Sequence, residues 1–257
     1  MKIQYVIGIV ALLFCTSGLA ADLDRASVES LLAKTTSGHP ADLRRKDLRD
    51  VDLSGLDFTQ ADLWGSDLRR ANLSNSNLSG LNLDLTVMTK INLSGANLSN
   101  TSIFGVSMMG ANLSKANLTK SRFIANLDRS NLTHADLRDA NWGVDMKNQP
   151  MGLMRVSLNN VDLSGADLSN ANLNRALLRH AKLIGSILRN TILFSADLSG
   201  ADFTNADLSG ADLSGCNLTD TDFTGSNLAG TRFSGIKDKS QLKGLETSKN
   251  LNSAIFE

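Results

Sequence analysis

Apolar residues recur at every fifth position over most of this chain. The run is unbroken from Leu43 to Phe123, slips by one position at Leu127, and is unbroken again from Leu153 to Phe233. Small side chains precede most apolar centres by two positions, Asp or Asn precede them by one, and Ser followed by Gly, Asn or Arg comes after. A period of five fits neither an α-helix nor a flat strand. It predicts a chain that turns a corner every five residues, with two side chains pointing inward and three outward.

The repeat A-[DN]-L-x-x, seen in residues 61–65 (ADLWG) and 206–210 (ADLSG), resembles that of the pentapeptide-repeat family. The resemblance covers about residues 41–235 and rests on many consecutive matches, which makes it highly specific. It implies an all-β fold, a right-handed quadrilateral β-helix with four repeats in each coil.

A coil of 20 residues also follows from the sequence itself. Met88 and Met108 lie 20 residues apart, and so do Phe203 and Phe223. Unusual centre residues therefore recur one coil later, where we expect them to stack. With about 4.8 Å between coils, roughly nine to ten coils make a rod on the order of 45 Å long.

The first 20 residues are typical of a secretory signal peptide. Lys2 provides a positive start, an apolar run follows, and the small residues at Gly18 and Ala20 suit a signal peptidase. We expect cleavage after Ala20, and therefore a periplasmic or secreted protein without stable membrane insertion. The mature chain then keeps one cysteine, Cys216, and no intrachain disulfide is possible.

Both ends of the repeat carry segments that suit caps, which solenoids need because a bare terminal coil is an open sheet edge. Residues 21–40 include a predicted short helix at 27–34. Residues 236–257 lose the repeat and are interpreted as a C-terminal cap. Residues 143–152 carry Pro150 and are predicted to form a loop that leaves the helix. Lys46 occupies an inward position, which suggests that the first coil is frayed or open.

The sequence shows no catalytic, nucleotide-binding or metal-binding motif that we recognise. His39, His134 and His180 fall in the segment before the repeat or at outer corners, and Cys216 replaces a small inward residue. Asp136 lies near His134, but corners carry such residues routinely. We therefore predict a protein that is not an enzyme and has no catalytic residue, cofactor or metal.

The charge of the chain is balanced overall, with 26 basic and 26 acidic side chains. It is uneven along the rod, because residues 101–190 hold 11 basic and 6 acidic residues, and residues 191–230 hold six Asp and no base. The family resemblance includes quinolone-resistance proteins that mimic DNA and engage DNA gyrase. Mimicry needs negative charge along much of the rod, and only its last two coils qualify. Nucleic acid is not an expected partner.

Outward positions of this repeat should be polar, yet several of them are apolar on one side of the rod. An apolar ladder on a solvent-facing surface is typical of a binding site. We predict a surface for a protein partner or for self-association, unless the N-terminal helix or the 143–152 loop folds over it. The predicted surface consists of Trp64, Leu85, Val87, Phe104, Met109 and Ile124.

Taken together, the sequence favours an exported, non-enzymatic β-solenoid that acts as a rigid protein-interaction scaffold. Two alternatives remain open at this point. One is a DNA mimic that interacts with a topoisomerase, and the other is a ligand-binding module at the interrupted coil, residues 143–152.

Overall fold

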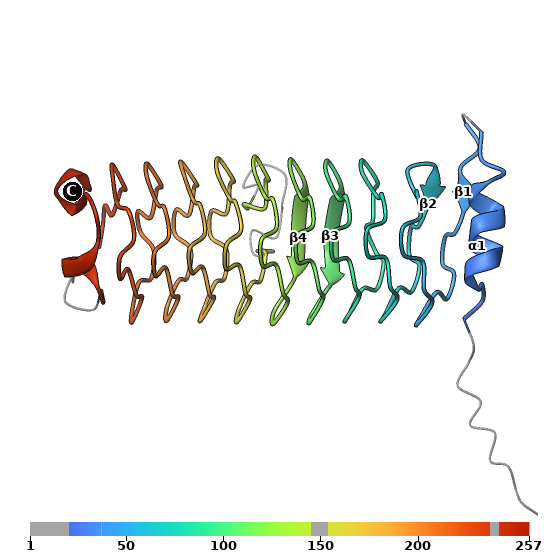
Figure 1. Cartoon of the computed structure of the whole chain (residues 1–257), viewed down its shortest axis with the longest axis horizontal. Coiled ribbons are helices and arrows are strands. Elements are labelled where there is room, and N and C mark those ends of the chain that lie inside the picture. The colour runs from blue at the N-terminus through green and yellow to red at the C-terminus, as the bar shows by residue number, and fades with distance from the viewer. Residues whose placement is uncertain (1–20, 37, 145–153, 237–241, 257) are drawn as a thin grey trace, which may run out of the picture.

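The computed structural model describes residues 21–36, 38–144, 154–236 and 242–256. Figure 1 shows a straight rod of stacked coils, with helix α1 (Arg25–Leu32) across one end and the C-terminal residues across the other. The segment 1–20, expected to be a signal peptide, lies outside the described residues. So does most of the loop expected at 143–152.

Parallel backbone pairing between successive coils gives the rod four faces. Asp47 pairs with Asp67 on one face and Asp52 with Asn72 on the next, so that each residue meets its counterpart in the following coil. Most contacts are single bridges, because the chain turns after every fifth position. Longer strands occur on one face, which we call the β1–β4 face. Its strands are β1 (Ala41–Asp42) paired with β2 (Ala61–Asp62), and β3 (Ser102–Ser107) paired with β4 (Arg122–Asn126).

The apolar centres fill the interior of the rod. Leu43 and the centres that follow it are almost completely buried, and each contributes about 1.5–3 kcal/mol through its removal from water. The stacking expected from the coil-length spacing is confirmed for Phe203 and Phe223, whose ring centroids lie 5.4 Å apart at an interplanar angle of 2°. Phe123 and Trp142 stack in the same way, at 4.8 Å.

Each corner is a tight turn that places one residue in the left-handed region. In the first corner the amide of Lys46 donates to the carbonyl of Leu43 (3.4 Å), and Arg45 has φ 54°. A positive φ at the third turn residue is the requirement of a type II turn, which explains the Gly and Asn at this position. Gly65 occupies the equivalent place one coil later, with φ 68°.

Asn and Asp side chains connect the corners of neighbouring coils. Asn72 accepts a hydrogen bond from the amide of Ser74 (3.2 Å), which fixes the turn that follows. The same side chain donates to Asp52 of the previous coil (2.9 Å), and Asn92 donates in turn to Asn72 (2.9 Å). An Asn or Asp before a centre can therefore cap one turn and link two coils.

The register changes twice in the middle of the rod. Asn112 pairs with Asn131, one position short of the regular spacing, because the repeat ending at Leu127 is itself one position short. Asn126 then pairs with Ser157, because the chain between these two coils contains additional residues. The additional residues follow Val144 in the sequence, and the coils beyond them resume the regular spacing.

Helix α1 closes the N-terminal end of the rod. Asp24 caps the helix by accepting from the amide of Ser27 (2.9 Å), and Val28 is fully buried against the first coil. The helix begins and ends two residues earlier than predicted.

The expectation of a frayed first coil is wrong. Asp22 closes that coil, because its amide and its carboxylate both bond to the backbone of Asp47 (2.8 Å each), and Lys46 stays half-buried.

The C-terminal residues complete the tenth coil instead of only covering it. Lys243 pairs with Asp222 and Lys249 with Asn227, and both pairs are separated by slightly more than the regular coil. Two 3-10 turns, η2 (Leu245–Thr247) and η3 (Leu251–Ser253), take up the additional length. Phe256 then stacks on Phe233, with ring centroids 4.8 Å apart.

We predict that Gly244→Ala detaches this last part of the rod. Gly244 has φ 72°, and a Cβ there would lie 2.6 Å from the backbone Cα of Thr224, which cannot move aside. Hydrogen exchange should show that the amides of Lys243 and Lys249 lose protection. Gly230→Ala is the matched control, because Gly230 has φ 65° but no atom within 4 Å of the added Cβ. Both variants carry the left-handed strain of about 1–2 kcal/mol. Equal protection in the two would contradict the role assigned to Gly244.

Candidate interaction surface

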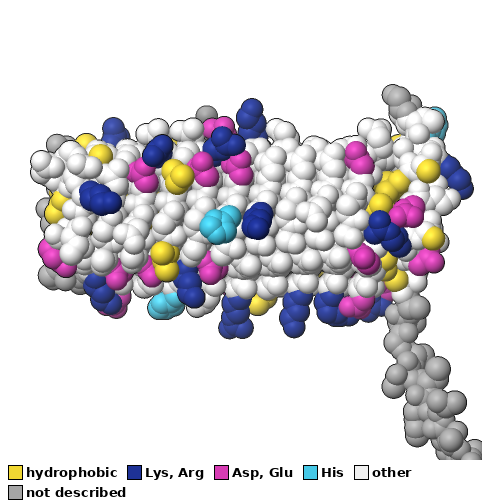
Figure 2. Space-filling model, viewed as in Figure 1, with side chains coloured by type: hydrophobic (Ala, Val, Ile, Leu, Met, Phe, Trp, Pro, Cys, Tyr) yellow, Lys and Arg dark blue, Asp and Glu magenta, His cyan; other side chains and the backbone are white. Residues whose placement is uncertain are grey.

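The corners that follow the β1–β4 face form a row along the rod, which we call the corner row. One corner of this row comes from each coil, so that neighbouring positions lie about 4.8 Å apart. The first four corners hold Arg44 and Arg45, Trp64 and Gly65, Asp84 and Leu85, and Phe104 and Gly105. Elsewhere on the rod, corners are dominated by Ser, Thr, Asn and Gly. On the side drawn in Figure 2, coloured side chains gather at the α1 end and again over the half nearer the C-terminus, with a largely white stretch between them.

Four of the six residues predicted to form a partner surface are clearly exposed. The exposed fractions are 57% for Leu85, 44% for Phe104, 38% for Val87 and 37% for Met109. Leu85 and Phe104 belong to successive corners of the row, Val87 lies on the next face, and Met109 lies at the corner that follows that face. Exposed apolar side chains are therefore found on two neighbouring corners and on the face between them.

Leu85 is the most unusual of the four. Its φ is 61°, and among the described non-glycine residues with positive φ it is the sole apolar one. A branched aliphatic side chain costs more in the left-handed region than Asn or Asp. More than half of it is also exposed, so burial does not offset the strain. Neither the turn nor the core accounts for a leucine at this position, which makes it a candidate for function.

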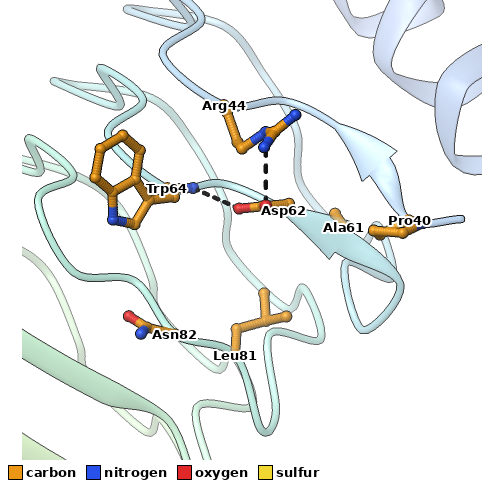
Figure 3. Close-up of a pocket in the computed structure, with 7 residues that line it drawn as sticks. All are labelled: Pro40, Arg44, Ala61, Asp62, Trp64, Leu81 and Asn82. Carbon is orange, nitrogen blue, oxygen red and sulfur yellow. Dashed lines mark hydrogen bonds and ion pairs between the residues drawn. The ribbon is translucent and has the colours of Figure 1, made fainter. Parts of the chain in front are cut away.

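Trp64 is only half-buried and lines a shallow pocket of about 410 Å³ (Figure 3). The Arg45 guanidinium lies over its ring, 5.0 Å from the centroid. Asp62 accepts from the amide of Trp64 (3.1 Å), and Arg44 approaches the same carboxylate at 3.6 Å (Figure 3). Leu81 lies across the pocket from the indole. Trp64 is thus part of the surface, but its ring is held by neighbours within the chain.

The prediction that Ile124 is exposed is wrong, because only 3% of its surface is accessible. Ile124 lies in β4, where the repeat is one position short, so the chain runs straight instead of forming a full corner. Its backbone pairs with Phe104. Met154, from the next coil, reaches across this place to within 4.0 Å of the Cβ position of Gly105, and it lines the same pocket as Ile124.

The alternative that α1 folds over the apolar surface is also wrong. Figure 1 shows α1 across the end of the rod, and its buried Val28 belongs to the core. The loop predicted at 143–152 lies mostly outside the described residues. Met154, which follows it, covers Ile124 and remains 40% exposed itself.

Sequence reasoning missed a second apolar pair on the same face. Ile192 and Phe194 are 42% and 44% exposed. Ile192 stands between Asn172 and Asp212 in the ladder of bridges, where a polar side chain that caps the turn is the rule. The signal was available, because an Ile at a position that otherwise carries Asp or Asn breaks the repeat.

Some of the Asp residues in the last coils form ion pairs with arginines of the preceding coil, which neutralise part of their negative charge. Arg179 contacts Asp197 and Arg189 contacts Asp207, each at 2.6 Å. A different network covers the first two coils, where Arg49 bridges Asp47 and Asp67. The six Asp residues without a base in their own coils therefore do not make an uninterrupted negative surface.

The described residues offer little to catalysis. Burial raises the pKa of the Cys216 thiol to about 12, which keeps it protonated and unreactive at neutral pH. His180 has φ 53°, and its ring occupies the space where Gly200 lacks a side chain. Within the described ranges there is no group of three or more His, Cys, Asp or Glu suited to a metal ion. No helix in the same ranges is long and apolar enough to span a membrane.

A family model of pentapeptide repeats matches this chain with eight copies, over residues 41–124, 157–193 and 196–235. The chain belongs to the pentapeptide repeat family. The fold class expected from the sequence, a right-handed quadrilateral β-helix, is thereby confirmed. No curated protein matches the chain significantly.

Solved structures of other pentapeptide repeat proteins resemble this one. HetL, involved in heterocyst differentiation regulation in the cyanobacterium Nostoc sp. strain PCC 7120, is 27% identical over 91% of this chain and 94% of that chain, with a TM-score of 0.38. QnrB1, a plasmid-mediated fluoroquinolone resistance protein, is 19% identical over 81% of this chain and 91% of that chain, with a TM-score of 0.39. At such TM-scores the family match alone carries the assignment.

We predict that Leu85→Asn leaves this pentapeptide repeat protein as stable as before or more stable, because Asn tolerates the left-handed region better than Leu. The reciprocal control is Asn100→Leu, at the same turn position with φ 58°. It should lower the free energy of unfolding by about 1 kcal/mol. Urea denaturation of both variants measures this. Destabilisation by Leu85→Asn would show that the fold itself needs the leucine.

We predict that the first two coils weaken in acid. Hydrogen bonds from Arg44 and Arg49 lower the pKa values of Asp42 and Asp47 to about 2. In the unfolded chain such groups titrate near about 3.9. Their contribution to stability is therefore complete above about pH 4 and is lost as the pH falls towards 2. Fluorescence of a variant that carries Trp142→Phe, so that Trp64 is its sole tryptophan, measures the loss during urea unfolding at pH 5 and pH 3. Asp47→Asn should reduce the difference between the two pH values, and an unchanged difference would contradict the assignment.

Proposed function

We propose that this protein is an exported, non-enzymatic scaffold that presents the corner row of its β1–β4 face to another protein molecule. The observation that carries the proposal is Leu85, an exposed leucine in a left-handed turn. Phe104 follows it in the next corner of the row, and Val87 and Met109 are exposed apolar side chains on the neighbouring face and at the corner beyond it. Exposed apolar side chains of this kind lower the solubility of the protein and add nothing to its core. Binding to a partner is therefore the simplest explanation for their presence.

The rigidity of the rod supports the role of a scaffold. Backbone bridges and side-chain ladders fix each corner to the corners above and below it. Asp84, for example, accepts from the amide of Phe104 in the next coil (2.8 Å), so that these two side chains keep a constant spacing. Little conformational entropy is then lost when a partner binds, which favours affinity from a modest apolar area.

A DNA mimic directed at a topoisomerase is less well supported. The acidic coils are bridged by Arg179 and Arg189, and the coils before them carry a net positive charge. Residues 1–20 also favour export, which would separate the protein from DNA. No described pocket collects groups suited to catalysis, which agrees with a binding role.

The proposal is tested by photo-crosslinking in the native cell. A benzoylphenylalanine at Phe104 is expected to give crosslinked adducts. The same residue at Ser114 is the matched control, because Ser114 occupies the same turn position of the same coil on the opposite face. The adduct should be found outside the cytoplasm, and its mature chain should begin at Ala21. Absence of adducts at Phe104, or equal adducts at Ser114, would overturn the interaction surface. A cytoplasmic protein that keeps Met1 would overturn the export.

A further inference from the structure

The second and third coils, which begin at Ala61 and Leu81, are not bonded to each other on the β1–β4 face. On the other three faces the same two coils are joined by the bridges Asp67–Val87, Asn72–Asn92 and Asn77–Asn97. On the β1–β4 face, the described residues form no bridge between Asp62 and Asn82, and the amide of Asn82 does not donate to the carbonyl of Ala61. Figure 1 shows the coil that carries β2 standing apart from the next coil on this side. The ladder of hydrogen bonds is therefore open between these two coils.

The shallow pocket beside Trp64 lies over this open step (Figure 3). It is lined from the second coil by Ala61 and Asp62, and from the third coil by Leu81 and Asn82. Its volume of about 410 Å³ falls within the range of small-ligand sites. The carbonyl of Ala61 and the amide N–H of Asn82 do not bond to each other here, and backbone groups outside a ladder need another partner. The pocket thus offers a backbone donor and a backbone acceptor to a ligand.

Two side chains of the pocket add further donors. The Oδ1 atom of Asn82 accepts from the amide of Asp84 (2.8 Å), which leaves its Nδ2 atom as a donor. Within the part of the chain that the structure describes, neither this Nδ2 nor the indole Nε1 of Trp64 has an acceptor. The other tryptophan differs, because Nε1 of Trp142 donates to the hydroxyl of Ser121 (3.0 Å). In Figure 3 the nitrogen of the Trp64 indole is on the edge of the ring that is turned towards Asn82.

The charged groups around the pocket balance one another. Arg44 forms two hydrogen bonds with Asp42 (2.9 and 3.1 Å) and approaches Asp62 at 3.6 Å. The guanidinium of Arg45 lies over the ring of Trp64. Two basic and two acidic groups thus stand together, so that an anion and a cation each meet repulsion as well as attraction. A neutral ligand that both donates and accepts hydrogen bonds suits this site best.

We propose that the pocket binds a neutral sugar that carries an acetamido group. The N–H of that group donates to the carbonyl of Ala61, and its C=O accepts from the N–H of Asn82. The ligand thereby supplies the bonds that the two coils do not make with each other, and its methyl group packs against Leu81. Neighbouring hydroxyl groups of the sugar ring donate to the carboxylate of Asp62 and accept from the indole N–H of Trp64.

A peptide suits the pocket less well. A peptide backbone has the same amide group, but it has no neighbouring hydroxyl groups for Asp62 and Trp64. The sugar site also goes beyond the proposed function, because it uses neither Leu85 nor Phe104 of the corner row. Either proposal can therefore fail while the other stands.

Nuclear magnetic resonance of the purified protein tests the site, with triacetylchitotriose as the probe. The indole N–H of Trp64 and the backbone amide of Asn82 should shift as the probe is added, and hydrogen exchange of the Asn82 amide should slow. The indole N–H of Trp142 is the internal control and should not shift, because it is buried and bonded to Ser121. Cellotriose, a matched sugar without acetamido groups, should bind about tenfold more weakly, since it lacks the amide that pairs with the open ladder.

Three variants test the contacts. Trp64→Phe keeps an aromatic ring and loses the N–H, and it should weaken binding of triacetylchitotriose about tenfold. Leu81→Ala should weaken it about fivefold through the lost apolar contact. Phe104→Ser is the matched control, at the same repeat position two coils further along and outside this pocket, and should leave the affinity unchanged. The Trp142 indole resonance reports whether each variant is folded.

Each outcome decides between the ligands. No shift of the Trp64 and Asn82 signals at millimolar triacetylchitotriose overturns the sugar site, and so does an affinity that Trp64→Phe leaves unchanged. Equal binding of cellotriose overturns the role of the acetamido group. Binding of N-acetylalanine methylamide as tight as that of the sugar would assign the pocket to a peptide instead. A loss of crosslinked adducts at Phe104 would affect the proposed scaffold function alone.

Discussion

The positive φ of one residue at each corner is the constraint on which the rest of this structure depends. A left-handed residue turns the chain sharply enough for a five-residue repeat to close a square coil in four steps. The coils then stack in register, which places Asn72 within hydrogen-bonding distance of Asp52 in the previous coil and of Asn92 in the next. The centres stack for the same reason, as Phe203 and Phe223 show. The stacked apolar core, the hydrogen bonds between Asn and Asp side chains of successive coils, and the corners themselves all depend on this turn.

In this fold the outward side chains only need to allow the turn and to form its hydrogen bonds. Ser, Thr, Asn and Gly meet both requirements. An apolar residue such as Leu85 adds strain without adding core, and Ile192 gives up the cap that Asn172 and Asp212 provide in neighbouring coils. Departures from the repeat on the outside of the rod therefore report function more directly than departures in an ordinary globular core.

The fivefold period made the architecture predictable to the level of individual stacked pairs, because every coil repeats one local solution. Ile124 was not predictable from the same rule. A repeat one position short removes its corner, and Met154 reaches it from a later coil. The closing contacts of Asp22 and the wide tenth coil at Lys243 also lie where the repeat ends, so periodicity carries no information about them. The exposed apolar side chains were found because they break the pattern.

The central claim is that the apolar corner side chains serve binding and are not needed for folding. The most direct measurement is the free energy of unfolding of one variant that carries Leu85→Asn, Val87→Asn, Phe104→Ser and Met109→Ser, the residue types that the repeat favours at these positions. We expect a free energy of unfolding equal to or above that of the natural protein. A loss of about 2 kcal/mol or more would contradict it, because losses of that size indicate that a core or a cap has been disrupted.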